Sequence, residues 1–274
     1  MVALDHLTVA DATPPQLIEL AAGAGARAVC LFLESMAVLP SMPTFSLVRD
    51  ADLRRATRAR MDDLGVSVDL VYPFTLATRT ELEAFRPALE VAAELGAQAV
   101  NALVYHRDPG QRVESFGRFC ALAMEYGLKV AVELYPPSQV RTLSDALALA
   151  ASAGAPGGVG VNVDFLHLVR SGGDLAELRA APAEAILYGQ YSDAPPDCDP
   201  AYREYEATFQ RLFPGEGGLD VAGFARSLPV GVAASVEVPR EDLVAAGVPA
   251  AQRAREAVKR TLNILIAAHV CEEN

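Results

Sequence analysis

The chain has 274 residues, of which 51% are hydrophobic and 21% are charged. This composition supplies enough apolar side chains for a large core and excludes a small disulfide-stapled module. The net charge of −12 and the lack of Lys or Arg runs argue against binding to nucleic acid or to an anionic membrane surface. We therefore expect a small-molecule substrate as the partner, with a homo-oligomer left open.

The four cysteines, Cys30, Cys120, Cys198 and Cys271, lie far apart and form no CxxC pair. Such spacing is typical of reduced thiols rather than of a disulfide framework or a zinc site. The first ten residues lack a basic stretch followed by an apolar one, and no apolar run reaches the ~18 residues of a membrane span. These features predict a cytoplasmic protein with no membrane partner.

Short apolar segments alternate with longer amphipathic segments along the whole chain. This rhythm predicts strands at 4–10, 27–34, 66–74, 97–105, 129–136, 159–167, 185–193 and 232–239. It predicts helices at 14–24, 47–64, 79–95, 111–126, 142–153 and 174–181, within 200–228, and at 249–270. Thr13 precedes two prolines as a helix N-cap would, and Gly65, Gly96 and Gly127 follow predicted helix ends.

Eight strand–helix units predict a single (β/α)8 TIM barrel over residues 1–274, since no linker or repeat divides the chain. The alternative is a doubly wound open sheet, which usually has fewer strands and a phosphate-binding loop after the first one. Gly23 to Gly25, the glycine-rich candidate near the start, ends a predicted helix instead of opening one. The barrel is therefore favoured.

The last four predicted strands are each interrupted by a polar residue near the carboxyl end. In a barrel these ends meet at one opening, where three carboxylates would repel one another unless a cation lies among them. Oxygen ligands favour Mg²⁺ or Mn²⁺ over zinc. The residues, Glu133 in AVELYP, Asp164 in NVDFLH, Gln190 in GQYSD and Glu237 in SVEVP, predict a divalent metal site, although any one alone could instead cap a helix or pair with an arginine.

Weaker candidates for substrate binding follow the earlier strands. An Arg or His in such a loop would hold an anionic or hydroxyl-rich substrate, although loop residues are often polar without any such role. These candidates are His6, Glu34, Tyr72, His106 and Arg107. The long segment 194–218 between the last two strands is typical of a lid or a binding loop.

Several segments together resemble the xylose isomerase-like TIM barrels, sugar phosphate isomerases and epimerases that include ketose 3-epimerases, inosose dehydratase and 3-dehydroshikimate dehydratase. They are LTVADATPPQLIELAAGAGARAV, GLKVAVELYPPSQVRTLSDAL, VDFLHLVRSGGDLAEL, YGQYSDAP, PGEGGLD and SVEVP, spread over nearly the whole chain. The resemblance implies metal ligands at Glu133, Asp164 and Glu237. The family's third ligand is usually the His of His-x-x-Asp; here Gln190 replaces it, as in the dehydroshikimate dehydratases, and Asp193 keeps the second half of the motif.

The resemblance also implies that His167, in Asp-x-x-His, binds the substrate. A neutral imidazole there would hydrogen-bond a substrate hydroxyl or relay a proton, and the alternative is a core histidine bonded to a backbone carbonyl. Arg170 with SGGD resembles a further family motif in a loop that would approach a ligand. The alternative for that segment is an ordinary helix start capped by Asp174.

The predicted site favours proton movement next to a carbonyl. A metal that bridges a carbonyl and its neighbouring hydroxyl stabilises the enediolate, while Glu133 and Glu237 alternate as base and acid. The first hypothesis is a divalent-metal-dependent isomerase or epimerase of a small keto-sugar or related polyol. The second, raised by Gln190, is a dehydratase of a cyclic 3-keto polyol such as 3-dehydroshikimate or an inosose, and the third is a non-catalytic ligand-binding barrel.

Overall fold

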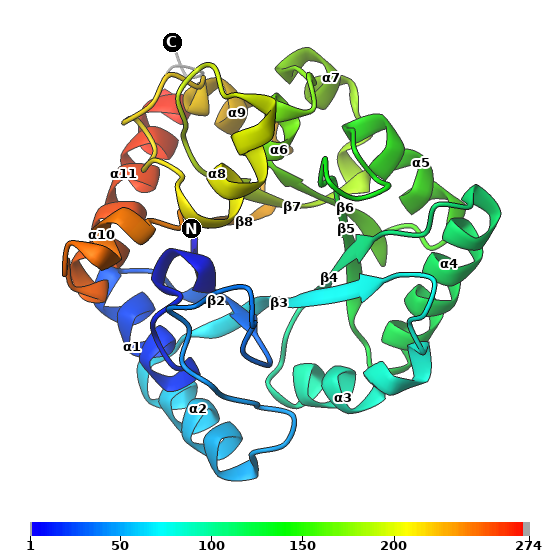
Figure 1. Ribbon diagram of the computed structural model, residues 1–274, viewed down its shortest axis with the longest axis horizontal. Helices are drawn as coiled ribbons and strands as arrows, with labels where there is room; N and C mark the ends of the chain where they lie inside the picture. Colours follow the sequence, from blue (N-terminus) through cyan, green and yellow to red (C-terminus); the bar gives the residue numbers. More distant parts are fainter. Residues whose placement is uncertain (1, 271–274) are drawn as a thin grey trace.

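The computed structural model of the protein describes residues 2–270 and forms a closed barrel of eight parallel strands (Figure 1). The strands are β1 (Ala3–Asp5), β2 (Ala28–Phe32), β3 (Ser67–Leu76), β4 (Ala99–Val104), β5 (Lys129–Glu133), β6 (Val159–Asp164), β7 (Ile186–Tyr191) and β8 (Ala233–Val236). Each strand pairs in parallel with the next along the chain, and β8 pairs with β1. This closure confirms the predicted TIM barrel and rules out the open sheet.

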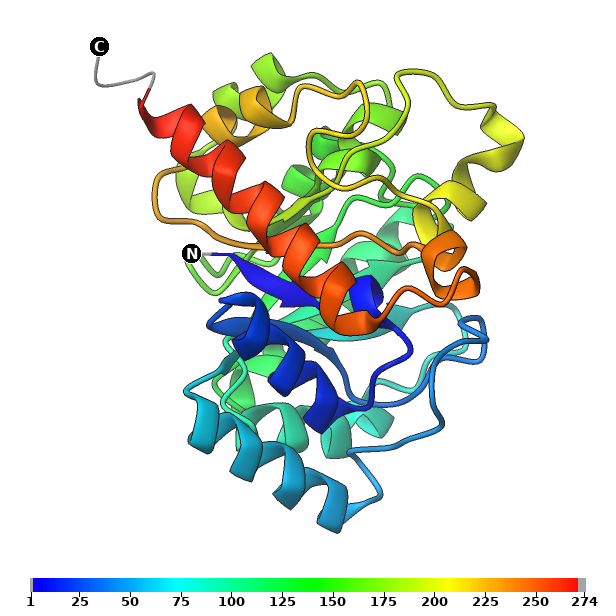
Figure 2. The same ribbon diagram turned by 90° about the vertical axis from the view of Figure 1, so that its left-hand side faces the viewer.

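Helices form a ring around the barrel (Figure 1). They are α1 (Pro14–Ala24), α2 (Ala51–Leu64), α3 (Arg86–Glu94), α4 (Pro109–Glu125), α5 (Leu143–Ser152), α6 (Phe165–Arg170), α7 (Leu175–Ala180), α8 (Arg203–Phe209), α9 (Val221–Ser227), α10 (Glu241–Ala245) and α11 (Ala250–Val270). The last of these crosses the outside of the barrel beside α1 (Figure 2). Within residues 2–270, no helix combines the length and the apolar character that crossing a bilayer requires.

Seven of the eight strands, all but β3, are shorter than the apolar segments that predicted them, and in two of the seven a carboxylate ends the strand. The segment 4–10 gives only β1, because the Asp5 carboxylate accepts a hydrogen bond from the backbone nitrogen of Leu7 at 2.9 Å and caps a 3-10 turn over His6–Val9. The segment 159–167 stops being a strand at Asp164, which accepts from the backbone nitrogen of His167 at 3.1 Å and starts α6. In both places a carboxylate caps the turn or helix that comes after it.

The predicted helices also differ from the observed ones at their ends. The expected helix 47–64 begins only at Ala51, because Asp50 acts as its N-cap and accepts from the backbone nitrogen of Leu53 at 2.9 Å. The expected helix 79–95 divides into a 3-10 turn over Leu82–Phe85 and then α3, which has proline in its first turn. The region 200–228 holds the short helices α8 and α9 with an ordered loop between them.

The loop between β7 and β8 folds back onto its first residues, where the side chain of Asp193 holds it. Asp193, which is buried, accepts hydrogen bonds from the backbone nitrogens of Ala194 at 2.8 Å, Gly215 at 3.0 Å, Gly217 at 2.9 Å and Leu219 at 3.1 Å. A carboxylate that satisfies four backbone donors stabilises the loop strongly. The predicted excursion over 194–218 is therefore an ordered loop that carries α8 beside the barrel opening (Figure 1).

A methyl group added at Gly217 would overlap the carbonyl oxygen of Ala194 and the carboxylate of Asp193. We therefore expect Gly217→Ala to destabilise the protein by about 1–3 kcal/mol, the usual cost of overpacking. Gly117→Ala in α4 is the matched control, because nothing lies within 4 Å of the new Cβ. It should leave stability unchanged or raise it by up to about 1 kcal/mol. Urea denaturation measures both, and equal effects would contradict the close packing of this loop.

Candidate active site at the barrel opening

A cavity of about 160 Å³ lies at the carboxyl ends of the strands, where TIM barrels carry their active sites. Its lining combines polar and apolar side chains. The polar ones are Tyr72, Asn101, Glu133, Tyr135, His167, Gln190, Thr208, Arg211 and Glu237. The apolar ones include Leu7, Phe32, Met36, Leu39, Pro73 and Leu103.

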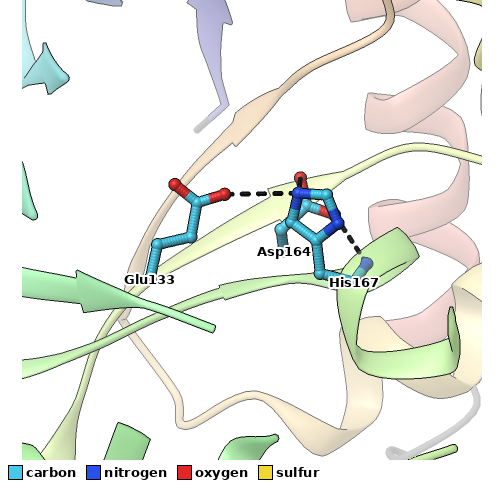
Figure 3. Close-up of side chains that lie close together, drawn as sticks. All are labelled: Glu133, Asp164 and His167. Atoms are coloured by element: carbon cyan, nitrogen blue, oxygen red, sulfur yellow. Dashed lines mark hydrogen bonds and ion pairs between the residues drawn. The ribbon is translucent and has the colours of Figure 1, made fainter. Parts of the chain in front are cut away.

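Glu133, Asp164 and His167 form a compact cluster in this region (Figure 3). Glu133 ends β5 and Asp164 ends the neighbouring β6, while His167 stands in the first turn of α6. The Nε2 atom of His167 lies 3.4 Å from Glu133 Oε1 and 3.9 Å from Asp164 Oδ2. One ligand atom from each of the three residues falls within 4.8 Å of the other two. Because Asp164 caps α6, the same carboxylate that ends the strand also places His167 against Glu133.

Arg211 connects this cluster to Glu237. Its guanidinium, almost completely buried, lies 2.5 Å from Asp164 Oδ2 and 2.8 Å from Glu237 Oε1. On the far side of Glu237, the Gln190 amide nitrogen donates to Oε2. The structure therefore brings together the four residues expected as metal ligands, but it inserts one guanidinium between two of them.

Negative charge exceeds positive charge in this buried region, and the carboxyl groups respond differently. Burial raises the pKa of Glu237 well above its usual range, although Arg211 opposes the rise. Burial raises the pKa of Asp5 to about 6, against a hydrogen bond from the Tyr72 hydroxyl. For Asp164 the burial effect is outweighed by Arg211 and His167, so its pKa is lowered. Carboxyl groups whose pKa values are driven apart are typical of acid–base sites.

The residues present fit a divalent metal. Carboxylates of Glu133 and Asp164 and the imidazole of His167 offer ligand atoms within 4.8 Å of one another, and a single guanidinium leaves much of the buried negative charge uncompensated. Two carboxylates suit Mg²⁺ or Mn²⁺, and the imidazole also suits zinc. The donor set therefore defines a candidate metal centre without selecting the metal.

Gln190 has the opposite orientation from the one a metal ligand needs. Its Oε1 accepts a hydrogen bond from Asn162 Nδ2 at 2.5 Å, and its Nε2 donates to Glu237 and, at 3.4 Å, to Asp5 Oδ2. In this orientation the side chain is a hydrogen-bond donor to carboxylates. Its oxygen would reach a cation only after the amide had rotated.

Of the expected substrate-binding residues, Tyr72 lines the cavity and donates its hydroxyl to Asp5. His6 does not reach the wall. Its Nε2 lies 3.0 Å from the carbonyl oxygen of Ala12, and its Nδ1 accepts from the backbone nitrogen of Phe32 at 3.4 Å. The 3-10 turn places His6 in the core. Burial there lowers its pKa to about 4, so the imidazole is neutral at pH 7.

Glu34 and Arg107 are exposed outside the cavity, and Glu34 forms an ion pair with Arg49 at 2.9 Å. His106 is buried away from the cavity wall, and its Nδ1 has no hydrogen-bond partner among the described residues. The loops after β2 and β4 thus carry these three side chains outward or into the protein rather than toward the substrate space.

Arg170 and Asp193 have structural contacts where substrate contacts were expected. Arg170 binds Glu206 of α8 through two hydrogen bonds of 2.8 and 2.7 Å, and it donates to the carbonyls of Pro195 and Pro196. Asp193 holds the loop that returns from α8 through the backbone nitrogens of Gly215 and Gly217. Both residues fix the segment that carries Arg211 rather than lining the cavity themselves.

Three buried polar residues of this region were not predicted from the sequence, namely Asp5, Asn101 and Asn162, and Arg211 was noted only as part of the predicted lid or binding loop. Asn101 and Asn162 interrupt apolar strands in the same way as Glu133 and Gln190 do, so the pattern that found the carboxylates could also have found them. Asp5 lies near the start of the predicted strand 4–10, so a pattern that marks polar residues at strand ends does not find it. Arg211 lies in the long loop, and no strand pattern predicts where such a side chain returns.

Comparison with known proteins supports this architecture. A model of the family described as xylose isomerase-like TIM barrel matches residues 18–264, which is most of the chain. A search of curated proteins found no match.

Three solved structures illustrate the similarity. A xylose isomerase-like TIM barrel/4-hydroxyphenylpyruvate dioxygenase fusion protein is 23% identical, with a TM-score of 0.81; the match covers 99% of this chain and 44% of that one. The IolI protein, which holds a zinc atom, is 19% identical over 97% of this chain and 98% of that one, with a TM-score of 0.78. AsbF of Bacillus anthracis, a probable 3-DHS dehydratase involved in petrobactin synthesis, is 14% identical over 94% and 97%, with a TM-score of 0.73. This chain thus spans less than half the length of the fusion protein.

The raised pKa of Asp5 predicts that this carboxyl group lowers the free energy of unfolding of the metal-free protein by an amount that depends on pH. The folded state binds this proton more tightly than the unfolded state does, so the carboxyl group's contribution to stability falls as pH rises from about 4 to about 6. Asp5→Asn should therefore raise the free energy of unfolding at pH 7 by up to about 3 kcal/mol, and the gain should vanish near pH 4. Urea denaturation in the presence of chelator, at several pH values, measures this difference.

The control is Asp63→Asn on α2, where the side chain is 68% exposed. It should leave the pH dependence of stability unchanged. A gain from Asp5→Asn that is the same at pH 4 and pH 7 would show that the Asp5 carboxyl group does not titrate between the two values.

Proposed function

Because the chain belongs to the xylose isomerase-like TIM barrel family, we propose that it is a divalent-metal-dependent enzyme that moves a proton next to a carbonyl group of a small substrate. One observation carries this proposal. Two glutamates, one at the end of β5 and one just after β8, each direct one oxygen toward the same cavity: Glu133 Oε1 lies 3.4 Å from His167, and Glu237 Oε1 lies 2.8 Å from Arg211. Paired carboxylates around one cavity are the usual means of removing and returning a proton.

Glu133 and Asp164 would hold the metal, with Glu237 rather than the imidazole of His167 as the third ligand, and Gln190 would add its oxygen if its amide rotates. When bound, the metal would supply Lewis-acid polarisation of the substrate carbonyl, which makes the neighbouring C–H group more acidic. Mg²⁺ or Mn²⁺ fits the carboxylate ligands, as the sequence also suggests.

The side chains around the cavity divide the remaining work. A glutamate accepts the proton from the carbon next to the carbonyl, and His167, 4% exposed and on the cavity wall, carries a proton to or from a substrate oxygen. Arg211 offers a guanidinium to an anionic group of the substrate once a metal takes over its carboxylate partners. The apolar side chains of the wall exclude water from the reacting carbon.

Between the candidate reactions, the wall of the cavity favours dehydration of a cyclic keto-polyol such as 3-dehydroshikimate. An open-chain sugar carries a hydroxyl group on nearly every carbon, whereas the lining residues Leu7, Phe32, Leu39 and Leu103 have side chains that offer no hydrogen bonds. In the dehydration, the C–H electron pair forms a C=C bond as the neighbouring C–O bond breaks. The hydroxyl group then takes a proton from His167 and leaves as water.

Isomerisation or epimerisation of a keto-sugar is the second candidate, and the two glutamates favour it. Glu133 and Glu237 come from β5 and from the residue after β8, so one can remove a proton and the other can return it at a different position or face. The two reactions share the first proton transfer and differ only in the later steps.

The first test combines metal analysis with NMR in D₂O over a panel of keto-sugars, inososes and 3-dehydroshikimate. We expect bound divalent metal, exchange of the proton next to the carbonyl, and loss of both on chelation. The melting temperature should fall only modestly on chelation, because the apolar barrel supplies most of the folding free energy. Absence of metal and of exchange with every compound would favour a non-catalytic binding barrel, and complete unfolding on chelation would indicate a structural metal.

The second test separates Glu237 from His167. Glu237→Gln keeps an oxygen ligand but loses the base, so metal should remain bound while kcat falls by roughly 10²–10⁴. His167→Ala should mainly raise KM if the imidazole only binds a hydroxyl group. If His167→Ala abolishes proton exchange as completely as Glu237→Gln does, the histidine itself carries the proton. Unchanged activity in both variants would place the chemistry elsewhere.

A further inference from the structure

Two asparagines lie inside the barrel beside the glutamates. Asn101 on β4 is 3% exposed, and Asn162 on β6 is completely buried. Interior positions of a TIM barrel are usually filled by branched apolar side chains. A buried amide that lacks partners costs about 1–3 kcal/mol, so the partners of these two residues are informative.

The two asparagines and Gln190 form a continuous hydrogen-bonded chain between Glu133 and Glu237. Asn162 Nδ2 donates to Asn101 Oδ1 at 3.1 Å and to Gln190 Oε1 at 2.5 Å. Asn101 Nδ2 in turn donates to Glu133 Oε2 at 2.5 Å, and Gln190 Nε2 donates to Glu237 Oε2. Four hydrogen bonds therefore connect the two glutamates through three amides.

Asn162 sets the direction of every bond in this chain. Both hydrogens of its amide point outward, one to each neighbouring amide, so Asn101 and Gln190 must both turn their oxygens toward Asn162. Their nitrogens then face the two glutamates. Because an amide has one donor end and one acceptor end, a central residue that donates twice fixes both arms at once.

The same arrangement selects which oxygen of each glutamate faces the cavity. Oε2 of Glu133 and Oε2 of Glu237 are both occupied by amide donors. The other oxygens, Oε1 in each case, face His167 and Arg211. Each carboxylate is thus fixed by one oxygen and presents the other.

We propose that Asn162 is a positioning residue for both glutamates, acting through Asn101 and Gln190. The inference rests on the proposed function only for the roles of Glu133 and Glu237 as metal ligands and as acid and base. A merely space-filling role does not account for Asn162, because its Oδ1 has no hydrogen-bond partner among the described residues. Leucine, of similar shape, would fill the same space without leaving an unpaired oxygen.

Asn162→Leu tests the proposal, with Ser235→Ala as the matched control. Ser235 is also buried inside the barrel, on β8, and it forms none of the four hydrogen bonds of the amide chain, so its removal leaves that chain intact. Titration calorimetry with Mn²⁺ should show a 10–100-fold loss of affinity in Asn162→Leu, the usual effect of removing groups that orient metal ligands. Affinity in Ser235→Ala should stay within about twofold of the unaltered protein.

A second measurement needs neither metal nor turnover. In the metal-free protein, the side-chain amide protons of Asn101 and Gln190 should exchange slowly with solvent, and NMR should show this protection lost in Asn162→Leu but kept in Ser235→Ala. If the unaltered protein binds no Mn²⁺, the proposed function fails while this measurement still decides the role of Asn162. A folded Asn162→Leu variant with unchanged protection overturns the positioning role, and so does unchanged Mn²⁺ affinity where the unaltered protein binds Mn²⁺.

Asn101→Leu keeps the proposal testable if Asn162→Leu does not fold. It removes only the arm to Glu133, so Mn²⁺ affinity should fall less than in Asn162→Leu, and protection of the Gln190 amide should remain. Loss of the Gln190 protection in Asn101→Leu, or full Mn²⁺ affinity in a protein that binds the ion, would contradict a chain directed from Asn162.

Discussion

One buried guanidinium group is surrounded by carboxylates at the opening of the barrel, and this imbalance of charge governs the rest of the site. Arg211 pairs with Asp164 and Glu237, whereas Glu133 and Asp5 have no cationic side chain of their own within ion-pairing distance among the described residues, apart from the histidine beside Glu133. Removing each charge from water costs several kcal/mol unless a partner compensates for it. Raised pKa values and amide donors are two responses to the same excess of negative charge, and the divalent cation that we propose for this site would be a third.

The long connection between β7 and β8 places that guanidinium. Next to Arg211, the backbone of Leu212 pairs with that of Asp193 through hydrogen bonds of 2.9 and 2.8 Å, and the Arg211 nitrogen donates to the carbonyl of Pro239 at 3.0 Å. Arg170 ties α8 to α6 through Glu206. Asp193 and Arg170 therefore influence the site through the position of Arg211, although neither lines its cavity.

The sequence was sufficient for the barrel and for three of the carboxylates, Glu133, Asp164 and Glu237, because these depend on local patterns, whereas Asp5 was missed. A polar residue at the end of an apolar strand must lie at the opening once the strands close, and this places Glu133, Asp164, Gln190 and Glu237. The role of Arg211 depends on how a long loop folds back, and no periodicity encodes that path. His6 was misplaced for a related reason: the cap formed by Asp5 ends the strand and turns the imidazole into the core.

Orientation of the amides was the other property that the strand pattern could not supply. The resemblance to the family implies a histidine where this chain has Gln190, and a histidine ring nitrogen that is held by a hydrogen bond would leave the other nitrogen to meet a metal. A glutamine amide instead has a donor end and an acceptor end of almost the same shape, so either can face the carboxylates. Its direction must be imposed by a neighbour, and Asn162 is the residue that contacts the Gln190 oxygen. With glutamine at this position, the buried Asn162 on the adjacent strand thus determines which end of the Gln190 amide faces the carboxylates.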